Sequence, residues 1–104
     1  MKQYQVVITP GIHERIERAF EYIFEQSPQN GVNWLQGIYQ AIDTLETMPA
    51  RCGRIREQAS FEIEIRELLY HSHRIIFTID EELMVVKVYE FRHAAQDDWI
   101  TKEE

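Results

Sequence analysis

The stretch FEIEIRELLYHSHRIIFTIDEELMVVKVYEFRH, residues 61–93, decides the fold. It divides into three runs rich in β-branched and aromatic side chains, which favour strands. The first run, Phe61–Tyr70, opens with the apolar and polar alternation of a half-buried strand. The second and third runs, Arg74–Ile79 and Leu83–Phe91, are separated by the acidic residues 80–82, a break short enough for a hairpin. We therefore expect three consecutive antiparallel strands.

The residues before this stretch predict one strand and two helices. Gln3–Thr9 alternates as a strand that Pro10 ends, because proline has no N–H for a ladder. Thr9 and Pro10 suit the start of a helix that continues to about Gln26. Apolar residues at helical spacing then predict a second helix from Pro28 or Gln29 to Thr47. The short connection indicates an antiparallel helical hairpin.

The remaining segments are a loop and a tail. Pro49–Ser60 has the composition of a loop, and Ala94–Glu104 is polar apart from Trp99 and Ile100. The tail is expected to form an optional short helix that holds Trp99 against the sheet. The predicted order is β-α-α-β-β-β(-α), an α+β fold in one domain over residues 1–104, with the helical hairpin on one face of a mostly antiparallel sheet. The other face is expected to be solvated or to bind a partner.

Composition limits the classes of function. The chain has 104 residues, 44% of them hydrophobic, and no apolar run long enough to span a membrane. The single cysteine excludes an internal disulfide framework, and we expect a cytoplasmic protein. The net charge of −7 is unlike a general phosphate binder. The charge is uneven, however: residues 51–74 hold five arginines and four glutamates, so a local basic region is expected there.

Familiar cofactor and metal motifs are absent from the sequence. It has no phosphate-binding loop, glycine-rich dinucleotide turn or CxxC pair, and we expect no cofactor. His71 and His73 place two imidazoles on one face of a strand, but no carboxylate or cysteine stands at ligand spacing, which favours an ordinary turn. Arginines beside Cys52 would lower its pKa, although a loop cysteine without a function is the stronger interpretation.

One group of basic residues has the side chains needed for phosphate chemistry. It consists of Arg66, Arg74, Arg92 and His93, which the predicted strands could bring to one end of the sheet. Guanidinium groups bind phosphate and stabilise developing negative charge, and an imidazole transfers protons near neutral pH. RNA supplies its own nucleophile, the 2′-OH, so such a group could cleave it. The alternative is a set of surface arginines paired with neighbouring glutamates, and periodicity and spacing favour that alternative.

The order of these motifs resembles the RelE/ParE superfamily of toxins from type II toxin–antitoxin, or plasmid stabilisation, systems. Arg66-Glu67-Leu68 followed by His73-Arg74-Ile75-Ile76-Phe77 resembles its R-E-L…Y-R-I-x-Y core. Residues 86–98, VKVYEFRHAAQDD, resemble its final strand and ending. The front half is also similar, with a Tyr-x-Val-x-Ile strand, a Thr-Pro step, a helical hairpin and Met48-Pro49 before an Arg/Gly loop.

The resemblance implies a toxin neutralised by a cognate antitoxin, which would carry Asp or Glu against the Arg-rich side. The superfamily divides between interferases that cut messenger RNA on the ribosome and inhibitors of DNA gyrase. The interferase roles would fall on Arg66 and on Arg92 or His93 as catalytic residues. Substrate-binding roles would fall on the loop arginines Arg51, Arg54 and Arg56, with Arg74 as an extra phosphate clamp.

From the resemblance we expect a ribosome-dependent mRNA interferase (endoribonuclease). The alternatives are a gyrase inhibitor that acts by binding and an inactive antitoxin-binding relative. Several departures from the family pattern strengthen the gyrase alternative without displacing the first expectation. Arg92-His93 reverses the usual His-Arg order, and Trp99 lies where some interferases have a catalytic Tyr or Phe. An indole stacks on a base but cannot usefully transfer its proton.

Overall fold

The computed structural model describes residues 3–96 and 98–99 of the chain. Four strands form one sheet in the order β1-β4-β3-β2. Their bounds are Gln5–Ile8 for β1, Arg66–Tyr70 for β2, His73–Asp80 for β3 and Val85–His93 for β4. β1 runs parallel to β4 and the other pairs are antiparallel, which confirms the predicted α+β sheet with its helical hairpin.

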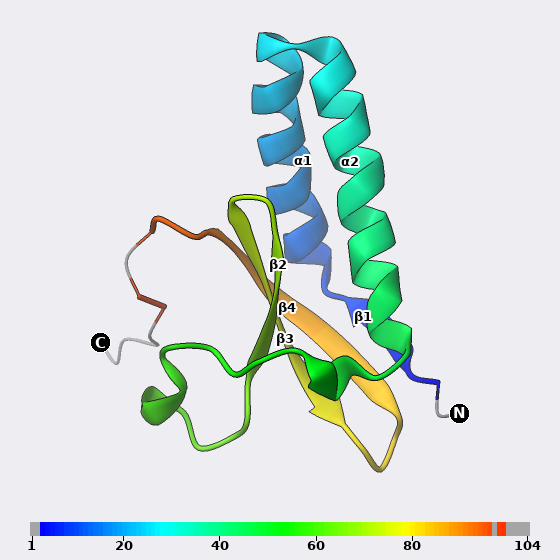
Figure 1. Ribbon diagram of the computed structural model, residues 1–104, viewed down its shortest axis with the longest axis vertical. Helices are drawn as coiled ribbons and strands as arrows, with labels where there is room; N and C mark the ends of the chain where they lie inside the picture. The colour runs from blue at the N-terminus through cyan, green and yellow to red at the C-terminus, as the bar shows by residue number, and fades with distance from the viewer. Residues whose placement is uncertain (1–2, 97, 100–104) are drawn as a thin grey trace.

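The helical hairpin consists of α1, Pro10–Gln26, and α2, Pro28–Asp43. Both helices begin with proline in the first turn, where its missing N–H costs no hydrogen bond. The Ser27 side chain accepts a hydrogen bond from the Asn30 backbone N–H and so caps α2. The outer half of the hairpin projects beyond the sheet (Figure 1). That half therefore offers helical surface that the sheet does not cover.

Two predicted boundaries were wrong. The second helix does not continue to Thr47, because α2 ends at Asp43 and a separate 3₁₀ turn follows over Thr44–Glu46. Residues 61–65 are not part of a strand, although they alternate as one. Ile65 is buried but Ile63 is 60% exposed, so the alternation does not place a continuous apolar face on the sheet. Arg66 therefore begins β2 rather than lying in mid-strand.

The sheet has apolar groups on both faces. The face toward α1 and α2 contributes Ile75, Phe77 and Val88 to the main core. Ile76, which points the other way, packs with Ile55 and Ile65 in a second cluster that also includes Phe61 and Trp99. The second face is therefore partly covered by the segment before β2 and by the tail, and it is not the fully open surface that we expected.

The tail was predicted to form an optional helix that holds Trp99 against the sheet. Residues 94–95 form a turn and Asp98 and Trp99 have no regular structure, while residues 97 and 100–104 lie outside the described part of the chain. Trp99 does pack against the sheet side, stacking on Phe61 with ring centroids 4.9 Å apart and meeting Tyr89 edge-on. None of the helices in the described residues is long and apolar enough to cross a bilayer.

Candidate functional site

The strand register separates the predicted cluster of Arg66, Arg74, Arg92 and His93. Arg74 lies opposite Arg92, and His73 lies opposite His93, so these positions alternate between the two faces of the sheet. Arg66 lies opposite Phe77, three residues along β3 from Arg74, which is about 10 Å along the strand. The structure therefore brings Arg74 and Arg92 together on one face, puts His93 on the other, and leaves Arg66 at the far end of β2.

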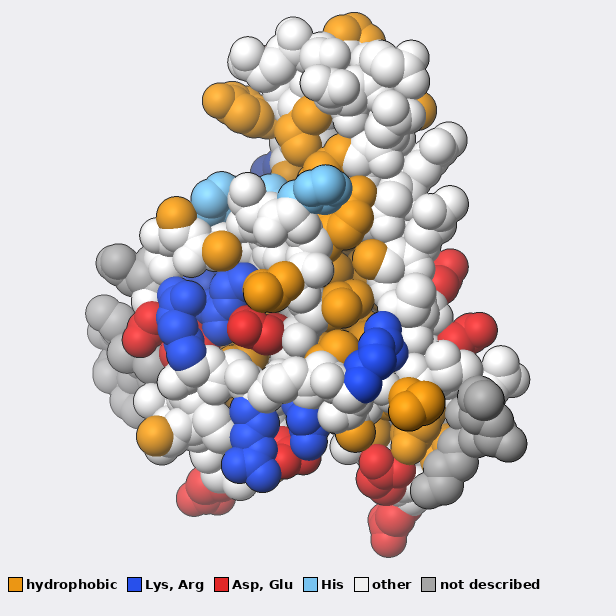
Figure 2. Space-filling view, in the orientation of Figure 1, with side chains coloured by type: hydrophobic (Ala, Val, Ile, Leu, Met, Phe, Trp, Pro, Cys, Tyr) orange, Lys and Arg blue, Asp and Glu red, His pale blue; other side chains and the backbone are white. Residues whose placement is uncertain are grey.

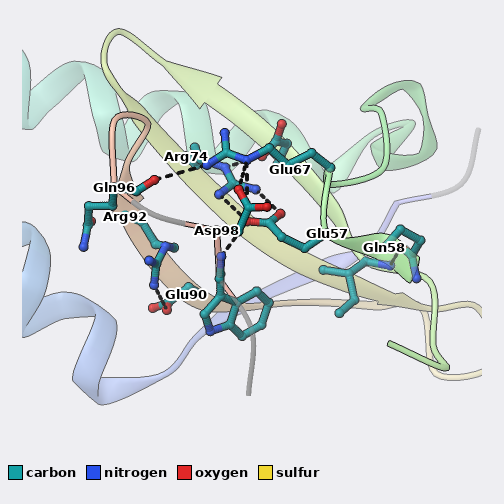
Figure 3. Close-up of polar contacts among 11 residues, drawn as sticks. Glu57, Gln58, Glu67, Arg74, Glu90, Arg92, Gln96 and Asp98 are labelled. Atoms are coloured by element: carbon teal, nitrogen blue, oxygen red, sulfur yellow. Dashed lines mark hydrogen bonds and ion pairs between the residues drawn. The ribbon is translucent and has the colours of Figure 1, made fainter. Parts of the chain in front are cut away.

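Arg74 is the centre of a buried ion-pair network (Figure 3). Its Nη1 and Nη2 donate to the two carboxylate oxygens of Glu57 at 2.9 and 2.7 Å, and its Nε donates to Glu67 at 2.6 Å. Only 1% of Arg74 and 4% of Glu57 is exposed. Burial alone would raise the pKa of Glu57, but hydrogen bonds from Arg74 and from the Trp99 backbone N–H outweigh it and lower that pKa to about 2. The hydrogen bonds to Glu57 likewise raise the pKa of Arg74, so both groups stay charged.

The three loop arginines also have partners within the chain. Arg51 donates to backbone oxygens at the end of the helical hairpin, including that of Thr47 at 2.9 Å. Arg54 pairs with Glu64 at 2.8 Å. Arg56 binds the Asp98 carboxylate at 2.7 Å and donates to the Gln96 carbonyl at 3.2 Å. These contacts fold the loop back on the helices and on the tail instead of presenting a row of free cations.

Arg66 and Arg92 also have partners within the chain. Arg66 donates to the Cys52 carbonyl and pairs with Glu64 at 3.2 Å. Arg92 pairs with Glu90 at 3.2 Å, and Arg15 of α1 also binds that carboxylate. Glu90 is buried, so the neutralising charge is built into β4. Each arginine that the sequence suggested for phosphate binding therefore contacts a carboxylate or a backbone carbonyl.

The hydrogen bonds of His93 restrict its proton chemistry. Its Nδ1 accepts from the Ala95 backbone N–H at 3.0 Å, so that nitrogen must keep its lone pair. A neutral ring then carries its proton on Nε2 and offers a donor, not a base, to anything bound there. An imidazolium would give up the Ala95 hydrogen bond. In this arrangement His93 is poorly prepared for general acid or base catalysis.

A cleft lies where the projecting helices meet the turn between β2 and β3. It has a volume of about 420 Å³ and is lined by three imidazoles, one indole and the apolar side of α1. Figure 2 shows the histidine side chains gathered at this junction beside the exposed apolar surface of the helices. Sequence reasoning identified His71 and His73 but missed Trp34, whose helical spacing marks it only as a core residue.

The structure also bears on two weaker candidates. No group of three His, Cys, Asp or Glu side chains within residues 3–96 and 98–99 has a geometry that could hold a metal. Burial raises the pKa of Cys52 and outweighs the opposing charges of Arg51 and Arg66, so the neighbouring arginines do not activate this thiol, in line with the favoured interpretation. The buried Glu57 is the residue of this region that sequence reasoning did not single out, because a lone glutamate in a loop carries no burial signal.

Comparison with known proteins places the chain in a family. Residues 6–98 match the model of the ParE toxin of the type II toxin–antitoxin system parDE. The chain belongs to the ParE toxin family. It is therefore the toxin component of a type II toxin–antitoxin system, within the RelE/ParE superfamily, and its partner is an antitoxin.

The fold of this ParE-family chain is similar to that of a solved complex. The crystal structure of the archaeal RelE–RelB complex from Pyrococcus horikoshii OT3 has a chain that aligns with a TM-score of 0.59 and 13% sequence identity. The alignment covers 90% of this chain and 98% of that one. At this identity the likeness shows the fold alone. No curated protein matches the sequence.

Proposed function

We propose that this ParE-family toxin acts by binding, that its target is DNA gyrase, and that the antitoxin prevents this binding. The proposal rests on the arginine network, whose charges are neutralised by carboxylates of the same chain. A phosphate clamp at Arg74 would have to displace Glu57, and that would leave a buried carboxylate without its partner, at a cost of several kcal/mol. The arginines serve the fold in this arrangement.

The separation of the ionisable groups supports the same proposal. Cleavage of RNA through its 2′-OH needs a proton acceptor beside the groups that bind the phosphate. His93 lies on the helical face, whereas Arg74 and Arg92 lie on the other, and His93 Nδ1 is already an acceptor for Ala95. Conversion to the interferase arrangement would require both the ion pairs and the end of β4 to rearrange.

The surface of the projecting hairpin supplies the binding element. Tyr22 and Phe24 on α1 are 67% and 40% exposed, and Val32 on α2 is 40% exposed. Large apolar side chains on a projecting helical pair are a common form of protein interface, with aromatic residues as anchors. We infer that this outer half of the hairpin contacts the target.

The proposal is tested with purified protein in a gyrase supercoiling assay. The wild-type chain is expected to inhibit supercoiling or to trap cleaved DNA, and the antitoxin is expected to reverse the effect. The double variant Tyr22→Ser/Val32→Ser removes apolar surface from the hairpin, and we expect at least a tenfold loss of inhibition, which corresponds to 1.4 kcal/mol of binding energy.

A matched control comes from the opposite end of the molecule. Leu83, in the turn between β3 and β4, is 72% exposed, and Leu83→Ser removes similar apolar surface there. This variant is expected to inhibit as the wild type does. Equal loss of inhibition in both variants would contradict the proposal that the hairpin contacts the target. A wild-type protein without any effect on gyrase would contradict the proposal that gyrase is the target.

A further inference from the structure

The histidines in the cleft form a compact cluster that the proposed function does not use. His73 and His93 lie directly opposite each other on β3 and β4, with ring centroids 5.2 Å apart. His71 lies two residues earlier, in the turn, and lines the same cleft. Three imidazoles thus share one cavity of about 420 Å³ between the sheet and the hairpin.

His73 is the member of the cluster that holds the turn against the helices. Its ring stacks on Phe91, with centroids 4.8 Å apart and planes 5° apart, and meets the edge of Trp34 on α2 at 5.6 Å. Its Nδ1 is buried and has no hydrogen-bond partner among the described residues. This environment suits a neutral aromatic ring and has no acceptor for an additional N–H.

Within residues 3–96 and 98–99, the groups around His73 offer no compensating negative charge. The cleft and the smaller cavity beside it are lined from α1, α2, β2, the turn and β4 by Ala19, Tyr22, Ile23, Asn30, Asn33, Trp34, Tyr70, His71, Ser72 and His93. None of these residues is Asp, Glu, Lys or Arg. The titratable neighbours of His73 are therefore Tyr22, Tyr70 and the other two imidazoles, and Glu90 and Arg92 belong to the opposite face of the sheet.

We propose that this cluster is a proton-sensitive latch, in which protonation of His73 releases the β2–β3 turn and the end of β4 from Trp34 and opens the cleft. An imidazolium at this position has no acceptor for Nδ1–H and faces two further imidazoles. Its buried Nδ1–H gains hydration by leaving the stack between Trp34 and Phe91. Burial, followed by the charges of His93 and His71, lowers the pKa of His73.

Two hydrogen bonds show what the latch would release. The Tyr70 hydroxyl donates to the Trp34 carbonyl at 2.9 Å, which joins β2 to α2. The Ala94 backbone N–H donates to the Ser72 carbonyl at 2.7 Å, which joins the start of the tail to the turn. Opening at low pH would expose Trp34 and both sets of backbone groups, while the Arg74–Glu57 network on the other face stays intact.

Two measurements on the full chain test the latch. NMR titration of the imidazole ring carbons is expected to give His73 a midpoint below 6.5, its ordinary value. Hydrogen exchange, corrected for the intrinsic effect of pH, is expected to show loss of protection over residues 68–75 and 91–95 between pH 7.5 and 5. Each pH unit by which the His73 midpoint is depressed corresponds to about a tenfold loss.

The variants separate the latch from general acid sensitivity. His73→Phe keeps an aromatic ring on Phe91 and removes the proton, so protection in these segments should no longer depend on pH. His13→Gln changes a histidine of α1 that stacks on and hydrogen-bonds to Tyr39, and it should respond as the wild type does. A His73 midpoint at or above 6.5, or an unchanged pH response in His73→Phe, would overturn the proposal. The titration of His73 in the wild-type protein tests the proposal even where the variant folds poorly.

Discussion

Arg74 and Glu57 form a bidentate ion pair almost completely removed from water, with both carboxylate oxygens bound at 2.9 and 2.7 Å. The pair joins the loop before β2 to the middle of the sheet, and the Trp99 backbone N–H adds a third donor at 2.7 Å. A single buried carboxylate therefore fixes the loop, β3 and the tail relative to one another. Arg74 therefore contributes to holding three separate segments of the fold together.

The variant Glu57→Gln tests the structural role of the pair. It replaces the charged partner of the two Arg74 Nη atoms by a neutral amide and leaves Glu67 bound at Nε, so we expect a loss of about 3 kcal/mol in the free energy of unfolding. The matched control is Glu64→Gln, whose exposed carboxylate pairs with Arg54 and Arg66, and its loss is expected to be much smaller because solvent screens those pairs. Urea unfolding monitored by circular dichroism measures both. Similar losses in the two variants would count against a buried network.

The pKa of Glu57 predicts how stability depends on acid. Because the folded-state pKa is about 2 and the ordinary value is 4.5, the unfolded chain binds a proton first as the pH falls. The stabilising contribution of Glu57 is complete above pH 4.5 and is lost between pH 4.5 and 2. The free energy of unfolding, measured at intervals across this window, should fall more steeply for the wild type than for Glu57→Gln. Parallel curves would show that another group dominates.

Gly37 is required by the way Tyr70 crosses α2. A Cβ atom at this position would lie 2.1 Å from the Tyr70 hydroxyl oxygen, which donates to the Trp34 carbonyl. Gly37→Ala should therefore destabilise the fold by about 1–3 kcal/mol, although alanine is the better helix former. Gly11→Ala, where nothing lies within 4 Å of the added Cβ, should be neutral or slightly stabilising. The double variant Gly37→Ala/Tyr70→Phe should recover part of the loss in thermal unfolding.

Arg66 provides a test that separates catalysis from folding. Its contacts with the Cys52 carbonyl and Glu64 predict that Arg66→Ala lowers the free energy of unfolding by about 1–3 kcal/mol. Gyrase inhibition by the folded fraction should be unchanged, because Arg66 begins β2 and is not one of the hairpin residues proposed to contact the target. Complete loss of toxicity in a variant with wild-type stability would instead favour a catalytic arginine.

The helices and the last two strands were predictable because their signals are local. Thr9 and Pro10 mark the start of α1, and Pro10–Gln26 matches the expected end at Gln26. The acidic break at residues 80–82 overlaps the turn between β3 and β4, although that turn covers residues 81–84 and β4 begins at Val85 and not at Leu83. The alternation in residues 61–65 was misleading. The Gln58 side chain donates a hydrogen bond to the Ile63 carbonyl and accepts one from the Ile65 N–H, so these backbone groups are not available to a neighbouring strand.

The arrangement of the arginines was not predictable in the same way. Sequence spacing suggested that Arg66, Arg74 and Arg92 meet, but faces and ends depend on the register, which places Arg66 opposite Phe77 and Arg74 opposite Arg92. The partner of Arg74 is Glu57, 17 residues away in a loop without a periodic pattern. Long-range pairing of this kind is a property of the folded chain and leaves no local signal.

Gyrase binding and mRNA cleavage are separated most directly by a map of messenger RNA 5′ ends after brief induction of the toxin in growing cells. We expect growth arrest without new 5′ ends at codon positions, together with accumulation of gyrase-linked DNA breaks or loss of supercoiling. New ends at codon positions that disappear in Arg92→Ala or His93→Gln would contradict it. That result would establish the ribosome-dependent nuclease and show that the ion pairs around Arg74 and Arg92 open on the substrate.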